Sequence, residues 1–239
     1  MGDLNLPGDI IDGALADGLP RVALITGASS GIGLALVEEL LAHESVEKVY
    51  AGCRRPADAS DLQAMALRDA RLEVVELDVT RAEGMARAAA AVEQRHGIDL
   101  LVNTAGVLHN KKGLWPEKRL SEVNTDDLLL AYDVNALGAI RLAIAFEPLL
   151  RAGKNPKFIS LSARVGSIGD NRLGGWYAYR ASKAALNMLL RTLAIEWGRL
   201  RPAIVCAGVH PGTVATALSK PFSRKSLHPQ PVAAAQAAS

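Results

Sequence analysis

Aromatic residues, cysteines and net charge are all scarce in this sequence. Aromatic residues make up 4% of the 239 residues, and the formal net charge at pH 7 is only +2. Proteins that bind nucleic acids use aromatic stacking platforms and blocks of lysine and arginine. The chain has no such block and few aromatic rings, so we expect no nucleic-acid partner.

Cysteines and long apolar runs are scarce as well. The two cysteines, Cys53 and Cys206, each lie in or beside an apolar segment, which favours two buried thiols in a reducing compartment over a disulfide framework. No apolar run approaches the length of a membrane span, and the N-terminus lacks a basic region followed by a hydrophobic stretch. We therefore expect a cytoplasmic protein with no membrane partner and no metal site.

The overall composition is that of a globular domain, with 49% hydrophobic and 22% charged residues. A chain of this length can bury a substantial core as one domain. The sequence predicts an N-terminal extension over 1–20, one domain over 21–219, and an irregular tail over 220–239.

Apolar strand-like runs alternate with helical patterns along this domain. Strands are expected at 21–26, 46–52, 72–77, 98–102, 157–162 and 203–209, and helices at 31–43, 58–70, 81–96, 126–150 and 177–199. This alternation predicts a single doubly wound α/β domain of the Rossmann type, with right-handed crossovers and a parallel sheet in the order 3-2-1-4-5-6. No seventh strand is recognisable in the tail.

A glycine-rich turn joins the first strand to the first helix, with the spacing Gly27-x-x-x-Gly31-x-Gly33. Turns often need glycine for conformational reasons alone. In a strand–turn–helix unit, however, the free N–H groups and the positive dipole end of the helix bind anions, and glycines let a phosphate approach the backbone. The residues expected to hold a dinucleotide here are Gly27, Ser29, Ser30, Gly31, Ile32 and Gly33.

Two arginines, Arg54 and Arg55, follow the second strand, where the adenosine ribose of a dinucleotide lies. An acidic residue at this place would bind the ribose hydroxyls and repel a 2′-phosphate, whereas an arginine binds that phosphate. The alternative is that both arginines are solvated loop residues. We expect NADPH, with Arg54 as its 2′-phosphate ligand, and consider NAD a weaker candidate.

Tyr179 and Lys183 lie four residues apart in the helix expected at 177–199 and therefore share one face. An ordinary tyrosine, with a pKa near ~10, is a weak acid at neutral pH, and a nearby cation lowers that pKa. Such a pair alone is most often a surface contact. After a glycine turn and Asn103-x-Ala105-Gly106, in this order, we interpret it as a catalytic acid and its neighbouring cation.

These motifs resemble the short-chain dehydrogenase/reductase family over about residues 21–219. The segment from Ala163 to Asn187, with Gly174-Gly175-Trp176-Tyr177-Ala178-Tyr179 at its centre, is similar to the C-factor and sniffer-like carbonyl reductase branch. The resemblance implies that Tyr179 is the general acid and that Lys183 anchors the ribose and modifies the pKa of the tyrosine.

The resemblance also implies that Asn135 holds a water molecule in a proton relay. Asparagine is unusual in the middle of a helix, and the alternative is an amide bonded to a neighbouring residue. Further contacts to the cofactor are expected from the residues that follow the other strands. These are Asp78 and Val79 beside the adenine by resemblance, Asn103, Ala105 and Gly106, and Pro211, Gly212, Thr213 and Val214 around the nicotinamide carboxamide.

The serine that binds the substrate carbonyl in this family is displaced here. The usual Ser-Ser-x-x-Gly becomes Ser162-Ala163-Arg164-Val165-Gly166, so the family position falls on Ala163. Adjacent residues of a strand face opposite sides. Ser162 serves if the strand end bends, Ser167 could reach in instead, or the donor is missing; our hypothesis is Ser162.

The expected reaction is reduction of a ketone or aldehyde to an alcohol by hydride transfer from NADPH. The alternative is a signalling or sensor protein of C-factor type that binds a dinucleotide with little or no turnover. By analogy with the family, helices 126–150 and 177–199 are expected to form the interface of a homodimer or homotetramer.

Overall fold

Six parallel strands form one sheet in the computed structural model, which describes residues 18–92 and 97–222. The order is β3-β2-β1-β4-β5-β6, as predicted, and no seventh strand occurs within the described ranges. The strands are β1 (Val22–Thr26), β2 (Lys48–Cys53), β3 (Leu72–Glu76), β4 (Leu100–Asn103), β5 (Lys157–Leu161) and β6 (Val205–Val209). The predicted extension over 1–20 and tail over 220–239 lie almost wholly outside the described residues.

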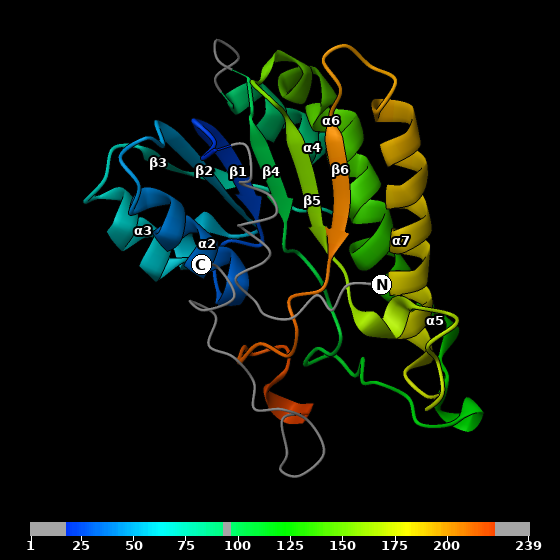
Figure 1. The fold of residues 1–239 in the computed structure, drawn as a ribbon. Helices are drawn as coiled ribbons and strands as arrows, with labels where there is room; N and C mark the ends of the chain where they lie inside the picture. The colour runs from blue at the N-terminus through cyan, green and yellow to red at the C-terminus, as the bar shows by residue number, and fades with distance from the viewer. Residues whose placement is uncertain (1–17, 93–96, 223–239) are drawn as a thin grey trace.

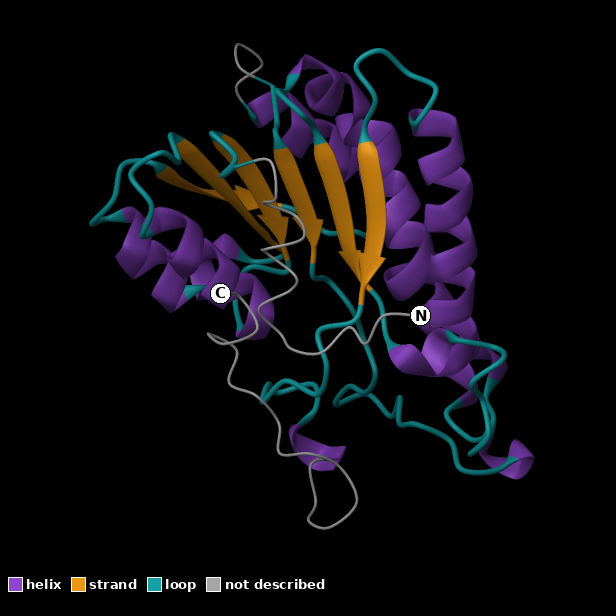
Figure 2. Ribbon diagram, in the orientation of Figure 1, coloured by secondary structure: helices purple, strands orange, loops and turns teal. Residues whose placement is uncertain are grey.

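Helices cover both faces of this sheet (Figures 1 and 2). One face carries α2 (Gly31–Leu41) and α3 (Ser60–Ala66), and the other carries α4 (Ala82–Ala91), α5 (Thr125–Tyr132), α6 (Gly138–Ala152) and α7 (Tyr177–Trp197). All elements expected from the sequence are present, with ends that differ by a few residues.

The central strand β1 is buried along its whole length because helices pack on both sides of it. Its alternate residues serve two separate cores. Val22 and Leu24 join the core under α4, α6 and α7, whereas Ala23 and Ile25 join the core under α2 and α3. This explains why its sequence is continuously apolar rather than alternating.

The helix expected at 126–150 is interrupted by a π-helical turn at Asp133–Leu137, between α5 and α6. Together the three segments run from Thr125 to Ala152, a span of 28 residues that is apolar and long enough to cross a membrane by length and composition. The expectation that nothing in the chain reaches that length is therefore wrong. The helix packs against α4 and α7 and contributes Leu142, Phe146 and other residues to the core, which is its role in this fold.

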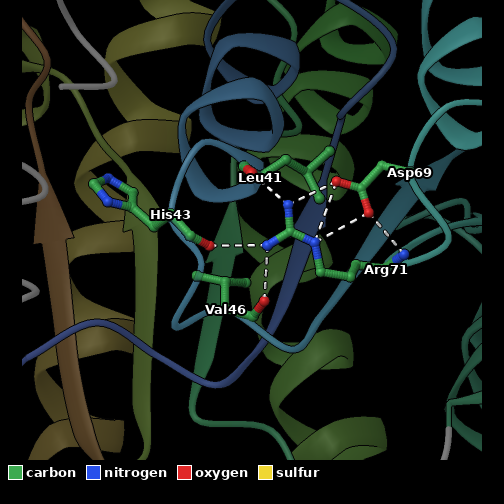
Figure 3. Close-up of polar contacts among 5 residues, drawn as sticks. All are labelled: Leu41, His43, Val46, Asp69 and Arg71. Carbon is green, nitrogen blue, oxygen red and sulfur yellow. Dashed lines mark hydrogen bonds and ion pairs between the residues drawn. The ribbon is translucent and has the colours of Figure 1, made fainter.

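Arg71 fixes the corner between α2 and β2 (Figure 3). Its guanidinium donates to the carbonyls of Leu41 (2.5 Å), His43 (2.9 Å) and Val46 (3.0 Å) and pairs with Asp69 at 2.7 Å. A cation at the C-terminal end of α2 satisfies free carbonyls and complements the helix dipole. The opposite end of the same helix is the expected phosphate site.

Candidate active site

The connections that follow β1, β4, β5 and β6 all lie beyond the carboxyl ends of the strands, at one edge of the sheet (Figure 1). In open parallel sheets, ligands bind at this edge where the strand order reverses, which here is between β1 and β4. The residues predicted for the site are therefore brought to the same end of the domain.

The glycine turn leaves no room for side chains. Gly27 has φ +67°, and a Cβ on it would lie 2.8 Å from Thr104 Oγ1. A Cβ on Gly33 would lie 2.5 Å from the carbonyl oxygen of Gly27. Thr104 donates its hydroxyl to the Thr26 carbonyl at 2.7 Å and so packs directly against this turn.

The start of α2 is open to a ligand. Ser30 is the N-cap residue, yet its side chain makes no capping bond, and the first turn of the helix contains no acidic residue. The first N–H groups of a helix need acceptors. A turn closed to side chains, in front of a helix end with unsatisfied donors, fits the phosphates of a dinucleotide.

At the end of β2, Arg54 is exposed, whereas Arg55 forms an ion pair with Asp58 at 3.0 Å. Asp78 accepts hydrogen bonds from the N–H (2.9 Å) and the hydroxyl (2.7 Å) of Thr80. Its structural role at the start of the β3–α4 connection is thus visible. Adenine contacts by Asp78 and Val79 remain predictions.

Tyr179, Lys183 and Asn135 come together beside the loop that follows β4. The Lys183 ammonium donates to the Leu161 carbonyl at 2.7 Å and lies 5.8 Å from the centre of the Tyr179 ring. A Cβ on Gly106 would lie 3.3 Å from Asn135 Oδ1 and 3.9 Å from Lys183 Nζ. Because Gly106 has no side chain, the loop can lie close to the Asn135 amide and the Lys183 ammonium.

The side chain of Asn135, in the π-helical turn, is held by hydrogen bonds to residues of two other segments. It accepts from the Val107 N–H at 2.7 Å and donates to the Val107 carbonyl at 2.8 Å and to Ser182 Oγ at 3.0 Å. The amide therefore joins α5–α6 to the β4 loop and to α7. This is the alternative weighed from the sequence; the proton relay remains a prediction.

Burial shifts the pKa values of both Tyr179 and Lys183. Burial raises the pKa of Tyr179 from 10.0 to about 12 and lowers the pKa of Lys183 from 10.5 to about 8. The expectation that Lys183 depresses the pKa of the tyrosine is not met, because the ammonium donates to the Leu161 carbonyl and desolvation of the phenol disfavours the phenolate. Tyr179 is thus fully protonated at neutral pH.

The hydrogen-bond partners of Ser162 are Asn187 and the Val209 carbonyl. Its hydroxyl donates to Asn187 Oδ1 at 2.5 Å, and its N–H bonds to the Val209 carbonyl. Asn187 lies two helical turns beyond Tyr179 along α7, roughly 12 Å at 1.5 Å per residue. Ser167 is exposed and accepts from the N–H of Asp170 at 3.3 Å. The structure thus records no contact of either hydroxyl with Tyr179 among the described residues.

The combination of the glycine turn and the Tyr179–Lys183–Asn135 group matches a known family along almost the whole domain. The model of the short chain dehydrogenases covers residues 21–227. The chain belongs to the short-chain dehydrogenase/reductase family. It is accordingly an NAD(P)-dependent oxidoreductase of this family.

Individual relatives support the predicted branch. The chain superimposes on an NADPH-bound carbonyl reductase from chicken fatty liver with a TM-score of 0.82 and 30% identity, covering 99% of this chain and 89% of that one. The carbonyl reductase Sniffer of D. melanogaster gives a TM-score of 0.79 at 28% identity over 92% and 88%. C-signal of Myxococcus xanthus is 40% identical over 52% of this chain and 70% of its own. The C-factor and sniffer-like resemblance is thus confirmed.

The segment after β6 holds a site residue that the sequence reading missed. Gly212 has φ +73°, Pro211 and Val214 are buried, and Thr213 is exposed. Thr216, which was not predicted, lies against the glycine turn: its Cγ2 would be 3.2 Å from a Cβ on Gly31. No local pattern marks this threonine, because its position depends on the path of the segment back across the sheet edge.

Proposed function

We propose that this short-chain dehydrogenase/reductase uses NADPH to reduce a ketone or aldehyde to an alcohol. One observation carries the proposal: Tyr179, whose pKa is raised to about 12, and the buried Lys183 stand at the same sheet edge as the open start of α2. The NADPH-bound carbonyl reductase from chicken, with its related fold, supports the choice of cofactor and reaction.

The arrangement of residues at this edge supports a set of cofactor contacts. The N–H groups at the start of α2 would donate to the pyrophosphate oxygens, and the exposed guanidinium of Arg54 would bind the 2′-phosphate. Lys183 donates to the ribose hydroxyls. Asn103, Ala105 and Gly106 would contact the cofactor along the loop after β4, and Pro211, Gly212, Thr213 and Val214 would hold the carboxamide. When bound, the reduced nicotinamide supplies the hydride that the carbonyl carbon accepts.

Tyr179 supplies the proton. As the carbonyl oxygen gains negative charge, the phenolic O–H donates its proton to that oxygen, which yields the alcohol and a phenolate. The relay through Asn135 would return a proton to this phenolate. A pKa of about 12 keeps the phenol protonated until the charge develops on the substrate.

Ser162 is our choice for the hydroxyl that binds the substrate carbonyl, and it must exchange its bond to Asn187 for one to the substrate. Losing such a donor costs roughly 10²–10³ in turnover in other enzymes. We expect this loss for Ser162→Ala, with Ser167→Ala close to wild type. Unchanged turnover of Ser162→Ala together with a loss for Ser167→Ala would transfer the role to Ser167. Unchanged turnover of both would mean that no serine has it.

Turnover of NADPH tests the proposed reaction directly. The protein is mixed with NADPH and a panel of ketones, aldehydes and quinones, and the loss of absorbance of the reduced cofactor is followed. We expect oxidation with at least one carbonyl compound and its disappearance in Tyr179→Phe. Tight NADPH binding without turnover on any compound would contradict the reductase and favour a dinucleotide sensor.

We further propose that α5–α6 and α7 form a subunit interface in a homodimer or homotetramer. Large apolar side chains remain exposed on these helices in one chain, among them Leu129 (64%), Ile144 (72%) and Met188 (67%). Exposed apolar patches of this kind mark interfaces. Light scattering on the purified protein should give a mass of two or four chains, and Met188→Lys should shift it towards one. A monomeric wild type would refute the proposal.

A further inference from the structure

An aromatic cluster surrounds the proposed acid. We use this name for the rings of His109, Trp115, Trp176 and Phe222. Phe222 is at the centre, with ring-centroid distances of 5.7 Å to His109, 5.1 Å to Trp115 and 5.3 Å to Trp176. Trp176 also meets the ring of Tyr179 edge-on at 6.2 Å. Three separate segments, the connections after β4, β5 and β6, thus converge on the catalytic phenol.

This concentration of rings is unusual for the chain. Only 4% of the residues are Phe, Trp or Tyr, which is three Trp, four Tyr and three Phe, yet three of these ten form the cluster beside a fourth, Tyr179. Other rings, such as those of Phe146, Phe158 and Trp197, are fully buried in the core. The cluster belongs to neither core, and Trp115 is 52% exposed. His109, Trp176 and Phe222 are half-buried, so part of each ring is accessible to a ligand.

The backbone that presents Trp176 is strained and firmly held. Trp176 has φ +53°, directly after Gly174 (φ +63°) and Gly175 (φ +65°). The left-handed conformation is unfavourable for a bulky side chain and persists only where the surroundings enforce it. Here the Trp176 N–H donates to the Glu117 carbonyl at 2.5 Å, and the buried Glu117 carboxylate accepts from the Ala178 N–H at 3.3 Å.

Strain of this kind at an active site points to a function that depends on the placed side chain. A tryptophan that only fastened two loops together would not need three consecutive residues in the left-handed region. The strained turn instead directs the indole ring towards Phe222 and Tyr179, where the carbonyl of the substrate is reduced in the proposed function.

We propose that Trp176 and Phe222 are specificity-determining residues that bind an aromatic ring attached directly to the substrate carbonyl. The proposal rests on the proposed function. Aromatic rings prefer edge-on or offset contacts with centroids 4.5–7 Å apart, and a ring bonded to a carbonyl carbon beside Tyr179 lies within this range of Trp176. The substrate class is aryl ketones and aryl diketones.

A matched pair of substrates separates ring chemistry from size. We suggest 1-phenyl-1,2-propanedione and 1-cyclohexyl-1,2-propanedione, which differ only in whether the ring is aromatic. The ratio of their kcat/KM values should be about tenfold or more in favour of phenyl for the wild type, the size expected of two ring contacts. It should fall to about threefold or less in Trp176→Leu and in Phe222→Leu, and Trp176→Phe should largely keep it.

Tyr177→Leu is the matched control, because Tyr177 is an exposed aromatic residue beside Trp176, and no ring contact of it is recorded in the described ranges. It should leave the ratio unchanged. The dissociation constant for NADPH, measured by fluorescence, should stay within about twofold in all variants, which checks that each is folded.

The outcomes distinguish this proposal from the one it rests on. NADPH-dependent reduction of both diketones with a ratio near one, or a wild-type ratio retained in both Trp176→Leu and Phe222→Leu, overturns the aromatic subsite and leaves the reductase intact. If Trp176→Leu fails to fold, Phe222→Leu decides the question. Absence of any NADPH oxidation overturns the proposed function itself, and the subsite with it.

Discussion

Replacing Lys183 by methionine should make the unliganded protein more stable at pH 7 while abolishing its function. Burial lowers the pKa of this ammonium from 10.5 to about 8, and the residue is only 4% exposed. At about 1.36 kcal/mol per pKa unit, holding the charged lysine inside the folded protein costs roughly 3 kcal/mol. Methionine removes this cost but leaves the Leu161 carbonyl without its donor, which lowers the free energy of unfolding by about 1–2 kcal/mol.

The expected net gain is therefore about 1–2 kcal/mol, or a rise in Tm of roughly 2–8 °C for a chain of this length. Urea unfolding without cofactor measures it. The cost in wild type is fully present below pH 8, where both folded and unfolded lysine are charged, and it disappears as the pH rises towards 10.5.

The stability advantage of Lys183→Met should consequently shrink by roughly 2 kcal/mol between pH 7 and pH 10. Tyr179 is present in both proteins, so its own titration cancels in the difference. A variant that is less stable than wild type at pH 7, or a difference that does not change with pH, would refute the reasoning that burial of a charge governs this residue.

Three further predictions concern the fold and the cofactor. Arg71→Met should clearly lower the urea concentration at the unfolding midpoint, because three backbone carbonyls lose their donor. Arg55→Met, which removes only an exposed ion pair, should leave the midpoint unchanged. Equal effects of the two substitutions would contradict the role given to Arg71. Gly33→Ala should lower the free energy of unfolding by about 1–3 kcal/mol and abolish NADPH binding, since its Cβ would lie 2.5 Å from a carbonyl oxygen. Gly169→Ala, where a Cβ would meet open space, should change the free energy of unfolding by less than about 0.5 kcal/mol. Arg54→Ala should weaken NADPH binding at least tenfold and NADH binding little, as measured by titration; equal losses would show that Arg54 does not bind the 2′-phosphate.

The fold was predictable because its signals are local and repeated. Each strand is a short apolar run, and each of the first five is followed by a helical pattern. This alternation indicates the doubly wound fold, whose strand order and right-handed crossovers are known. The π-helical turn at Asp133–Leu137 could not be predicted. It depends on the bonds of Asn135 with Val107 and Ser182, which are distant in sequence.

The site was predictable where a motif lies within one element or its adjoining turn. Gly27, Gly31 and Gly33, and the pair Tyr179 and Lys183, are of this kind. What the sequence could not supply depends on contacts between loops.

Three features depend on long connections that meet only in the folded domain: the position of Thr216 against the glycine turn, the hydrogen bonds of Glu117 with Trp176 and Ala178, and the convergence of rings on Phe222. The direction of the pKa shift of Tyr179 is likewise a property of burial. Sequence spacing does not report burial.

The most direct test of the central claim is single-turnover reduction by the protein loaded with NADPH, comparing wild type with Tyr179→Phe. We expect oxidation of the bound cofactor by a reactive aryl diketone in wild type, and a rate at least about 100-fold lower in the variant, with unchanged NADPH affinity. Equal rates in the two proteins would show that the phenol does not supply the proton and would contradict the account.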